Sequence, residues 1–235
     1  GMSVSQISAF RLFQGGPNSR VAVDSFPYSG QVLTHSANAI VTDSASSGTA
    51  FSAGEKTNNR ALGVDINGQP IENITETLDR SGYVSSVIST SEVTHATPAA
   101  FSSHVDSRRN TDEISSQMLE SKVATILGGG RKFFLSAENG GKRKDERDLL
   151  EEAKKSHKIL MHKHELDISG ITPSDRILGL FADEHLRDEE NPDNHSSEPT
   201  LTEMLRFSLE RAEAAIDNQC RGSFIMVEGS QVDWA

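Results

Sequence analysis

Short apolar runs alternate with helical segments along this chain, and this alternation restricts the fold more than any other feature. Runs that predict strands lie at residues 84–90, 123–127, 177–181 and 224–227. Between them, residues 72–80 predict a helix, and a second helix opens at Pro199 and carries one apolar stripe. Strands that alternate with helices pack as a mainly parallel sheet. We therefore predict an α/β fold.

The first third of the chain is rich in small and polar residues. Apolar side chains recur at helical spacing between Gln6 and Phe13, and residues 45–53 predict a helix of small residues that allows close packing. Residues 31–33 and Val41 predict short strands or extended chain. The highly charged residues 138–158 predict a solvated loop and helix.

Composition excludes several classes of function. The net charge of −11 argues against a nucleic-acid surface, because there is no basic excess to displace counterions. No apolar run is long enough to span a bilayer, and no N-terminal signal peptide is recognisable. The single cysteine, Cys220, cannot form a disulfide within the chain, so the redox compartment stays open. The 235 residues suffice for one large or two small domains.

Four oxygen-bearing side chains follow predicted strands or open a predicted helix: Ser44, Thr97, Glu228 and Asp233. Parallel sheets bind ligands beyond the carboxyl ends of their strands, so we expect these side chains to share one site. Ser44 lies in the run from Val41 to Ala50, where extended chain gives way to a helix. A helix N-terminus favours anions such as phosphate. The same Thr-Asp-Ser pattern is also typical of an ordinary helix N-cap.

Several sequence blocks, in order along the chain, resemble the alkaline phosphatases. The blocks are Thr42–Ala45, Lys56–Val64, Thr94–Phe101, His104–Arg108, Leu127–Gly130 and Met226–Ala235. The resemblance implies a single three-layer α/β/α domain over residues 1–235, with a charged insertion or surface region around residues 138–165. It also implies a phosphate monoester hydrolase with two Zn²⁺ and one Mg²⁺, which releases inorganic phosphate, acts as a homodimer and works in the periplasm or outside the cell. Nucleic-acid and membrane partners are not expected.

The resemblance assigns roles to individual residues. Ser44 would be the nucleophile that forms a phosphoserine intermediate and a ligand of the second zinc. Arg108 would grip the phosphate with its planar fork, with Arg109 as the alternative if the register is shifted by one. Asp43 would orient that arginine, although a helix cap explains it equally well.

Metal binding is implied for three further residues. Thr97 and Glu228 match magnesium ligands, and Asp233 matches a ligand of the first zinc. His95 and Trp234 match positions beside the metals, where a packing or surface role is the alternative. The other histidines match no motif and are expected at the surface: His157, His162, His164, His185 and His195.

The chain also departs from the family pattern. The aspartate expected before Gly1 and the histidines expected after Ala235 are absent, so the pattern predicts a family member truncated at both ends. Catalytic zinc takes three protein ligands, and these residues supply fewer. We therefore expect impaired or no turnover. The alternatives are a non-catalytic remnant that binds phosphate or a partner, and a phosphodiesterase of the same superfamily. A sulfatase is disfavoured because Ser44 lacks the proline and arginine that such enzymes place after the nucleophile.

Overall fold

A parallel sheet forms the centre of the protein. The computed structural model describes residues 4–188 and 197–234, and within them five strands form one sheet in the order β3-β4-β2-β1-β5, with every neighbouring pair parallel. The strands are β1 (Tyr83–Glu92), β2 (Thr125–Gly129), β3 (Lys158–Leu160), β4 (Ile177–Leu180) and β5 (Gly222–Glu228). The predicted parallel α/β fold is confirmed. Strand β3 was not predicted, because it is short and lies in a charged segment.

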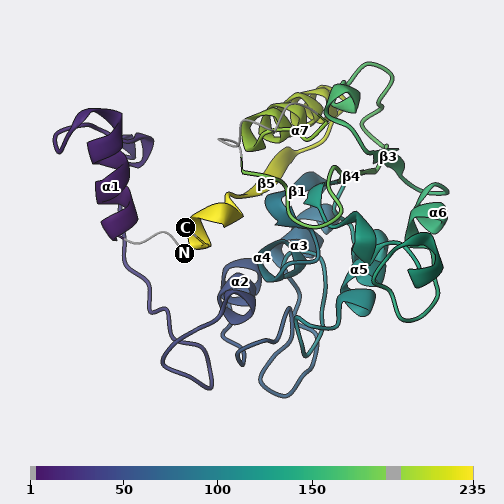
Figure 1. Cartoon of the computed structure of the whole chain (residues 1–235), viewed down its shortest axis with the longest axis horizontal. Coiled ribbons are helices and arrows are strands. Elements are labelled where there is room, and N and C mark those ends of the chain that lie inside the picture. Colours follow the sequence, from purple (N-terminus) through teal and green to yellow (C-terminus); the bar gives the residue numbers. More distant parts are fainter. Residues whose placement is uncertain (1–3, 189–196, 235) are drawn as a thin grey trace.

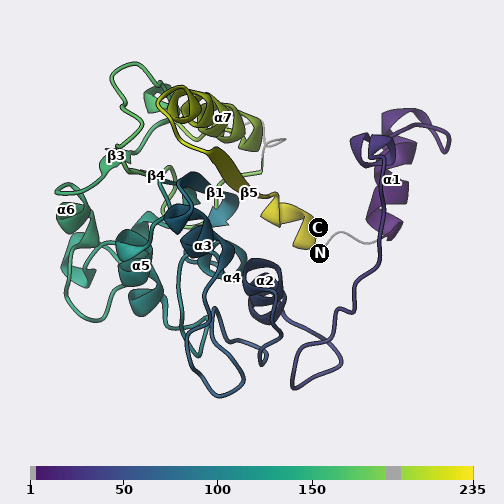
Figure 2. The ribbon, with the colours of Figure 1, turned by 180° about the vertical axis from the view of Figure 1, so that it is seen from behind.

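Helices cover both faces of the sheet. Five of them share one side: α2 (Ser44–Ala53), α3 (Ile74–Arg80), α4 (Ala96–Ala99), α5 (Thr111–Glu120) and α6 (Leu149–Ala153). Helix α7 (Leu201–Asp217) lies on the other side, as Figures 1 and 2 show from opposite directions. Neighbouring strand residues point into different cores: Val87 packs with the first group, whereas Ile88 packs with α7. This alternation gives the three layers.

Helix α1 (Val4–Gly15) stands apart from the sheet (Figure 1). None of its residues is buried, and Arg11 pairs with Asp24 of the short helix η1 (Ala22–Ser25) at 2.5 Å. Its Gln6 donates a hydrogen bond to the carbonyl of Val232. Residues 31–33 and 41 form no strand; all four are exposed, and Val41 lies in a bend. No helix in the described ranges has the length and apolar character needed to cross a membrane.

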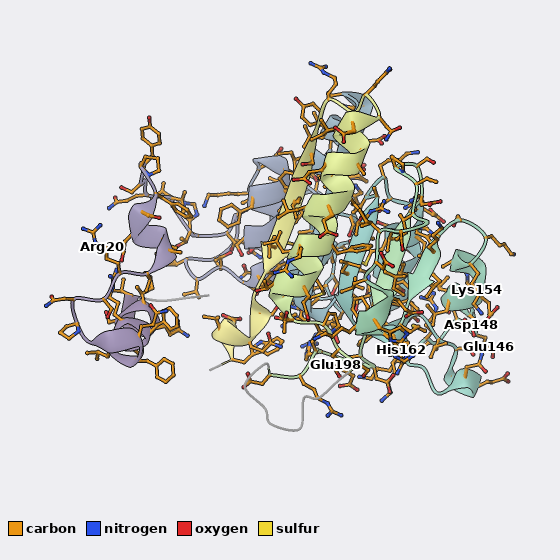
Figure 3. The ribbon with its side chains drawn as sticks, turned by 90° about the horizontal axis from the view of Figure 1, so that it is seen from above. Arg20, Glu146, Asp148, Lys154, His162 and Glu198 are labelled. Carbon is orange, nitrogen blue, oxygen red and sulfur yellow. The ribbon has the colours of Figure 1, made fainter. Side chains whose placement is uncertain are left out.

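The charged segment contributes to the sheet domain. It contains α6 and β3, and Leu149, Leu150 and Ala153 of α6 are buried. Glu146, Asp148 and Lys154, labelled in Figure 3, lie at the outer edge of the molecule near α6. The remaining short 3₁₀ helices are η2 (Arg131–Phe133), η3 (Ala137–Asn139), η4 (Lys163–Glu165) and η5 (Ser230–Asp233).

One expectation for the histidines is wrong. His157 is only 7% exposed, because it lies between α6 and β3 and its N–H bonds to the carbonyl of Ala153 at 2.7 Å. Charged neighbours in the sequence had suggested a surface position. His162, His164 and His185 are exposed, as expected, and His195 lies outside the described residues.

Burial of His157 predicts a loss of stability in acid. Burial, with a smaller contribution from Arg176, lowers the pKa of His157 to about 4, below its usual 6.5. As the pH falls, the imidazole of His157 is therefore protonated in the unfolded chain before it is protonated in the folded protein. The free energy of unfolding falls as the pH drops from 6.5 towards 4. We expect this residue to contribute roughly 3 kcal/mol of that fall.

Urea denaturation of the wild type and His157→Gln at several pH values measures the effect. The difference between the two proteins isolates this group from the carboxylates that also titrate. His162→Gln, which removes an exposed histidine, serves as the control and should leave the pH dependence unchanged. Parallel pH profiles for the wild type and His157→Gln would contradict the prediction.

Candidate functional site

The topology places the carboxyl ends of β1 and β5 side by side. The connection through α5 takes the chain from β1 to β2, whereas the connection through α7 takes it from β4 to β5 on the opposite side of β1. Ser89 of β1 lies opposite Glu228 of β5 in the parallel register. Such a change of direction leaves a crevice beyond the strand ends, where α/β proteins bind ligands. The candidate site residues lie along this edge.

Ser44 is the first residue of α2, and its neighbour Asp43 provides the helix cap. Asp43 Oδ1 accepts a hydrogen bond from the N–H of Ser46 at 3.0 Å. The sequence had left open whether the Thr-Asp-Ser pattern is a helix N-cap, and the structure shows that Asp43 is the cap. The hydroxyl of half-buried Ser44 makes no hydrogen bond with any residue that the structure describes, which leaves its oxygen available at the positive end of the helix.

Close packing of α2 on α4 brings Ser44 and Thr97 together. A Cβ on Gly48 would lie 3.0 Å from the Cβ of Ala100 and 3.6 Å from the Cα of Thr97, so the two helices approach as closely as glycine allows. Ser44 and Thr97 line one cavity of about 440 Å³ together with Glu228 and Asp233. The structure thus collects the four oxygen-bearing side chains that the sequence grouped.

Hydroxyl groups fix Glu228 at the edge of this cavity. Its Oε2 accepts hydrogen bonds from the Oγ atoms of Ser89 and Ser230, both at 2.8 Å. The N–H of Ser230 donates to Oγ1 of Thr90 at 2.9 Å, which ties the following η5 helix to β1. Asp233 at the end of η5 lines the same cavity.

Arg108 and Asp43 form the wall of a neighbouring cavity of about 570 Å³, which also contains Ser44 and Asp233. Arg108 Nη1 lies 3.5 Å from Asp43 Oδ2, and its Nη2 lies 3.0 Å from Nε2 of His95. Arg108 therefore takes the place beside Asp43, and Arg109 does not. Asp43 thus serves both as the helix cap and as the partner of this arginine.

Burial and hydrogen bonding set the charge states here. Burial alone would raise the pKa of Asp43. The N–H groups of Ser46 and Arg60 and the charge of Arg108 lower it by more, so the pKa of Asp43 lies below its usual value. Burial and the Arg108 charge lower the pKa of His95 to about 4. His95 is therefore neutral near pH 7, and its Nε2 accepts the hydrogen bond from Arg108.

His95 belongs to a cluster of three rings at the rim of the site. Its ring centroid lies 6.0 Å from that of Trp234 and 5.8 Å from that of His185, both edge-on, and Trp234 and His185 are 4.5 Å apart. His185 Nδ1 also accepts the N–H of Glu92 at 3.1 Å. Sequence reasoning missed the place of His185, because the residue lies in a charged segment that shares no motif with the rest of the site.

Sequence reasoning also missed the residues that hold the site in place. Ser89 and Ser230 support Glu228, and Asn59 Oδ1 accepts the N–H of Asp43 at 3.1 Å. A signal was present in the alternating serines at the carboxyl end of β1, since Ser89 and Ser91 point to the same face. Hydroxyl groups that face a glutamate on the neighbouring strand are typical of residues that hold a metal-binding carboxylate in position.

The available donors fit magnesium better than zinc. Thr97 and Glu228 offer hard oxygen atoms, and the two serines that bond to Glu228 leave its other oxygen for a cation. Ser44 and Asp233 are the further oxygen donors. Within residues 4–188 and 197–234, no three His, Cys, Asp or Glu side chains gather as a metal-binding group. A catalytic zinc takes three such ligands, so the described residues alone do not fit it.

Known proteins resemble the chain over its whole length. The family model described as alkaline phosphatase matches residues 1–235. Alkaline phosphatase 4 of Bacillus subtilis is 34% identical over all of this chain and 50% of its own length. The chain spans about half the length of such curated relatives.

Solved structures agree with this match. Alkaline phosphatase from the Antarctic bacterium TAB5 has a TM-score of 0.81 and 31% identity, covering 97% of this chain and 63% of its own. A mutant of the same enzyme, described as having Mg bound in its M3 site, has a TM-score of 0.83 and 31% identity, covering 97% and 62%. With the family model, they show that the chain belongs to the alkaline phosphatase family.

Proposed function

We propose that the chain hydrolyses phosphate monoesters, with Ser44 as nucleophile and Arg108 as the phosphate-binding group. The main support is the position of Ser44, whose hydroxyl has no hydrogen-bond partner among the described residues. Ser44 lines one cavity with Arg108 and a second one with Thr97 and Glu228, and Asp233 lines both. Membership of the family supports the same function. Homodimer formation and a periplasmic or secreted location are proposals that rest on the family alone.

The first step transfers the phosphoryl group to the protein. The Oγ of Ser44 forms a bond to phosphorus while the bond from phosphorus to the ester oxygen breaks. Serine loses its proton to solvent, and the departing oxygen takes up a proton and leaves as an alcohol. In the second step, water attacks phosphorus, and the bond to Oγ breaks. Inorganic phosphate leaves, and Ser44 regains its proton.

Arg108 orients the phosphoryl group for both steps. Its guanidinium offers parallel N–H donors to two phosphoryl oxygens. Asp43 and neutral His95 accept hydrogen bonds from its Nη1 and Nη2, which holds the plane of the fork towards the cavity that contains Ser44. Because His95 carries no charge near pH 7, it neither repels the arginine nor competes for the anion.

Metal ions would supply the remaining chemistry. Thr97 and Glu228 would hold Mg²⁺ through oxygen, and a bound cation lowers the pKa of a nearby hydroxyl and neutralises developing charge. The TAB5 mutant structure described as having Mg bound in its M3 site supports metal binding in general. Because the described residues do not complete a zinc site, we propose that these 235 residues turn over slowly.

Hydrolysis of para-nitrophenyl phosphate tests the proposal. We expect slow release of nitrophenol when Zn²⁺ and Mg²⁺ are added, and loss of that release after EDTA, since metal supplies the activation of Ser44. Restoring Mg²⁺ and Zn²⁺ after EDTA should recover it. Metal-independent hydrolysis would contradict the mechanism, and rapid turnover would contradict the proposed impairment.

A non-catalytic phosphate-binding role is the second candidate. The incomplete set of metal ligands among the described residues favours it, because the phosphate-binding arginine does not depend on those ligands. Calorimetry with inorganic phosphate, with and without metals, separates the candidates. Metal-independent phosphate binding without any turnover would favour the binding role.

A further inference from the structure

A second cavity adjoins the proposed phosphate site on the other side of Arg108. It has a volume of about 530 Å³, and Asp43 and Arg108 line both this cavity and the one that contains Ser44. Arg60 and Arg109 line the second cavity as well. In a chain with a net charge of −11, three guanidinium groups around one cavity form a local positive region.

Two of these arginines are available for a ligand. Arg108 is bonded to Asp43 and His95. The exposed side chains of Arg60 and Arg109 make no ion pair or hydrogen bond with any residue in the described ranges. Their guanidinium groups therefore keep all of their donors for an anion that enters the cavity.

The backbone at Arg60 is held in a conformation that few side chains adopt. Its φ angle is +77°, in the left-handed region, which costs a non-glycine residue about 1 kcal/mol. Its N–H donates to Asp43 Oδ2 at 3.1 Å, and its carbonyl accepts the N–H of Arg108 at 2.7 Å. The same contacts that position the phosphate arginine thus place a second arginine beside it. Glycine would relieve the strain at this position.

Two residues that line the same cavity also carry buried polar atoms without a partner. The hydroxyl of Thr94, a residue only 1% exposed, has no hydrogen-bond partner, and neither has Nδ1 of His95. Buried polar groups normally find partners, so these two groups are exceptions that lie directly behind the cavity wall. Because an arginine guanidinium can only donate, Nε2 of His95 accepts the hydrogen bond from Arg108, and Nδ1 carries the ring proton.

One carboxylate opposes an anion here. Glu92 lines the cavity, and burial raises its pKa to about 6, with Lys142 lowering it and Glu184 raising it. Asp43 is the other acid and is already bonded to Arg108. Three guanidinium groups thus face two carboxylates, so the cavity keeps an excess of positive charge.

We propose that this cavity is a second anion subsite, which binds a carboxylate or a further phosphate carried by the leaving group of the phosphate ester. The subsite rests on the proposed function, in which Arg108 holds the reacting phosphate. A substrate that spans Arg108 then places its second anion between Arg60 and Arg109. Phosphate esters of acidic alcohols are the substrate class that fits.

Calorimetry with matched phosphonates tests the subsite without turnover. Propylphosphonate carries one anionic group, whereas 3-phosphonopropionate and 4-phosphonobutyrate carry a carboxylate as well. With Zn²⁺ and Mg²⁺ present, we expect the wild type to bind one of the two diacids about tenfold more tightly than propylphosphonate. Arg60→Gly with Arg109→Ala should remove this preference and leave propylphosphonate binding almost unchanged. The glycine suits the backbone at residue 60, so the variant should fold.

Arg206→Ala, which removes an exposed arginine from α7, is the matched control and should keep the preference. Equal affinity of the wild type for all three ligands would overturn the subsite while leaving the phosphate site intact. A preference that survives in the double variant would overturn it too. Diacid binding without propylphosphonate binding would support the subsite and count against the proposed phosphate site.

Discussion

Replacing Ser44 with alanine is expected to abolish the covalent phosphate that the proposed mechanism forms from a phosphate monoester. The substitution removes only the side-chain hydroxyl group, which makes no hydrogen bond with any described residue. Turnover of para-nitrophenyl phosphate should fall at least about a thousandfold, because no other group takes over the attack on phosphorus. Mass spectrometry of acid-quenched protein measures the phosphoryl adduct, and peptide mapping locates it.

Stability separates the nucleophile from the helix cap. Ser44→Ala should change the free energy of unfolding by less than about 0.5 kcal/mol, because Asp43 caps α2. Asp43→Ala should cost about 1 kcal/mol through the lost cap. Ser8→Ala, which removes an exposed hydroxyl from α1, is the control and should leave the adduct intact. A phosphoryl adduct on Ser44→Ala protein would show that another residue is the nucleophile.

Replacing Arg108 with alanine is expected to lower kcat/KM roughly a hundredfold, the usual cost of removing a charged donor from a reacting phosphate. The variant also leaves Asp43 without its guanidinium partner and His95 without the donor to its Nε2. Phosphate affinity measured by calorimetry should weaken in parallel, because in the proposed mechanism the same guanidinium binds substrate and product.

The geometry of the fork predicts the behaviour of the lysine variant. Arg108→Lys keeps the charge but offers no two parallel donors, so we expect it to recover less than about a tenth of the lost activity. Arg206→Ala removes the same charge from the surface of α7 and should leave kcat/KM unchanged. Full activity in Arg108→Lys would mean that charge alone is needed at this position and would contradict the bidentate contact.

The sequence predicted the main elements because their patterns are local. β1, β2, β4 and β5 follow apolar runs, and α7 follows its apolar stripe. The sequence did not predict β3 or α5, which lack such patterns. β3 has only three residues and lies in a charged segment, and α5 buries only Ile114, Ser115 and Met118. Short or weakly amphipathic segments form because their neighbours cover them, and a local pattern does not contain that information.

For the site, the sequence by itself determined the family and the set of candidate side chains. Only the tertiary structure decided how they are arranged. Asp43 caps the helix and also contacts Arg108 rather than Arg109, because the loop that carries both arginines is tied to Arg60 by a backbone hydrogen bond. His157 is buried despite its charged neighbours in the sequence. Residue type fixes what a side chain can bind, whereas the packing of distant segments fixes which partner it meets and how much water surrounds it.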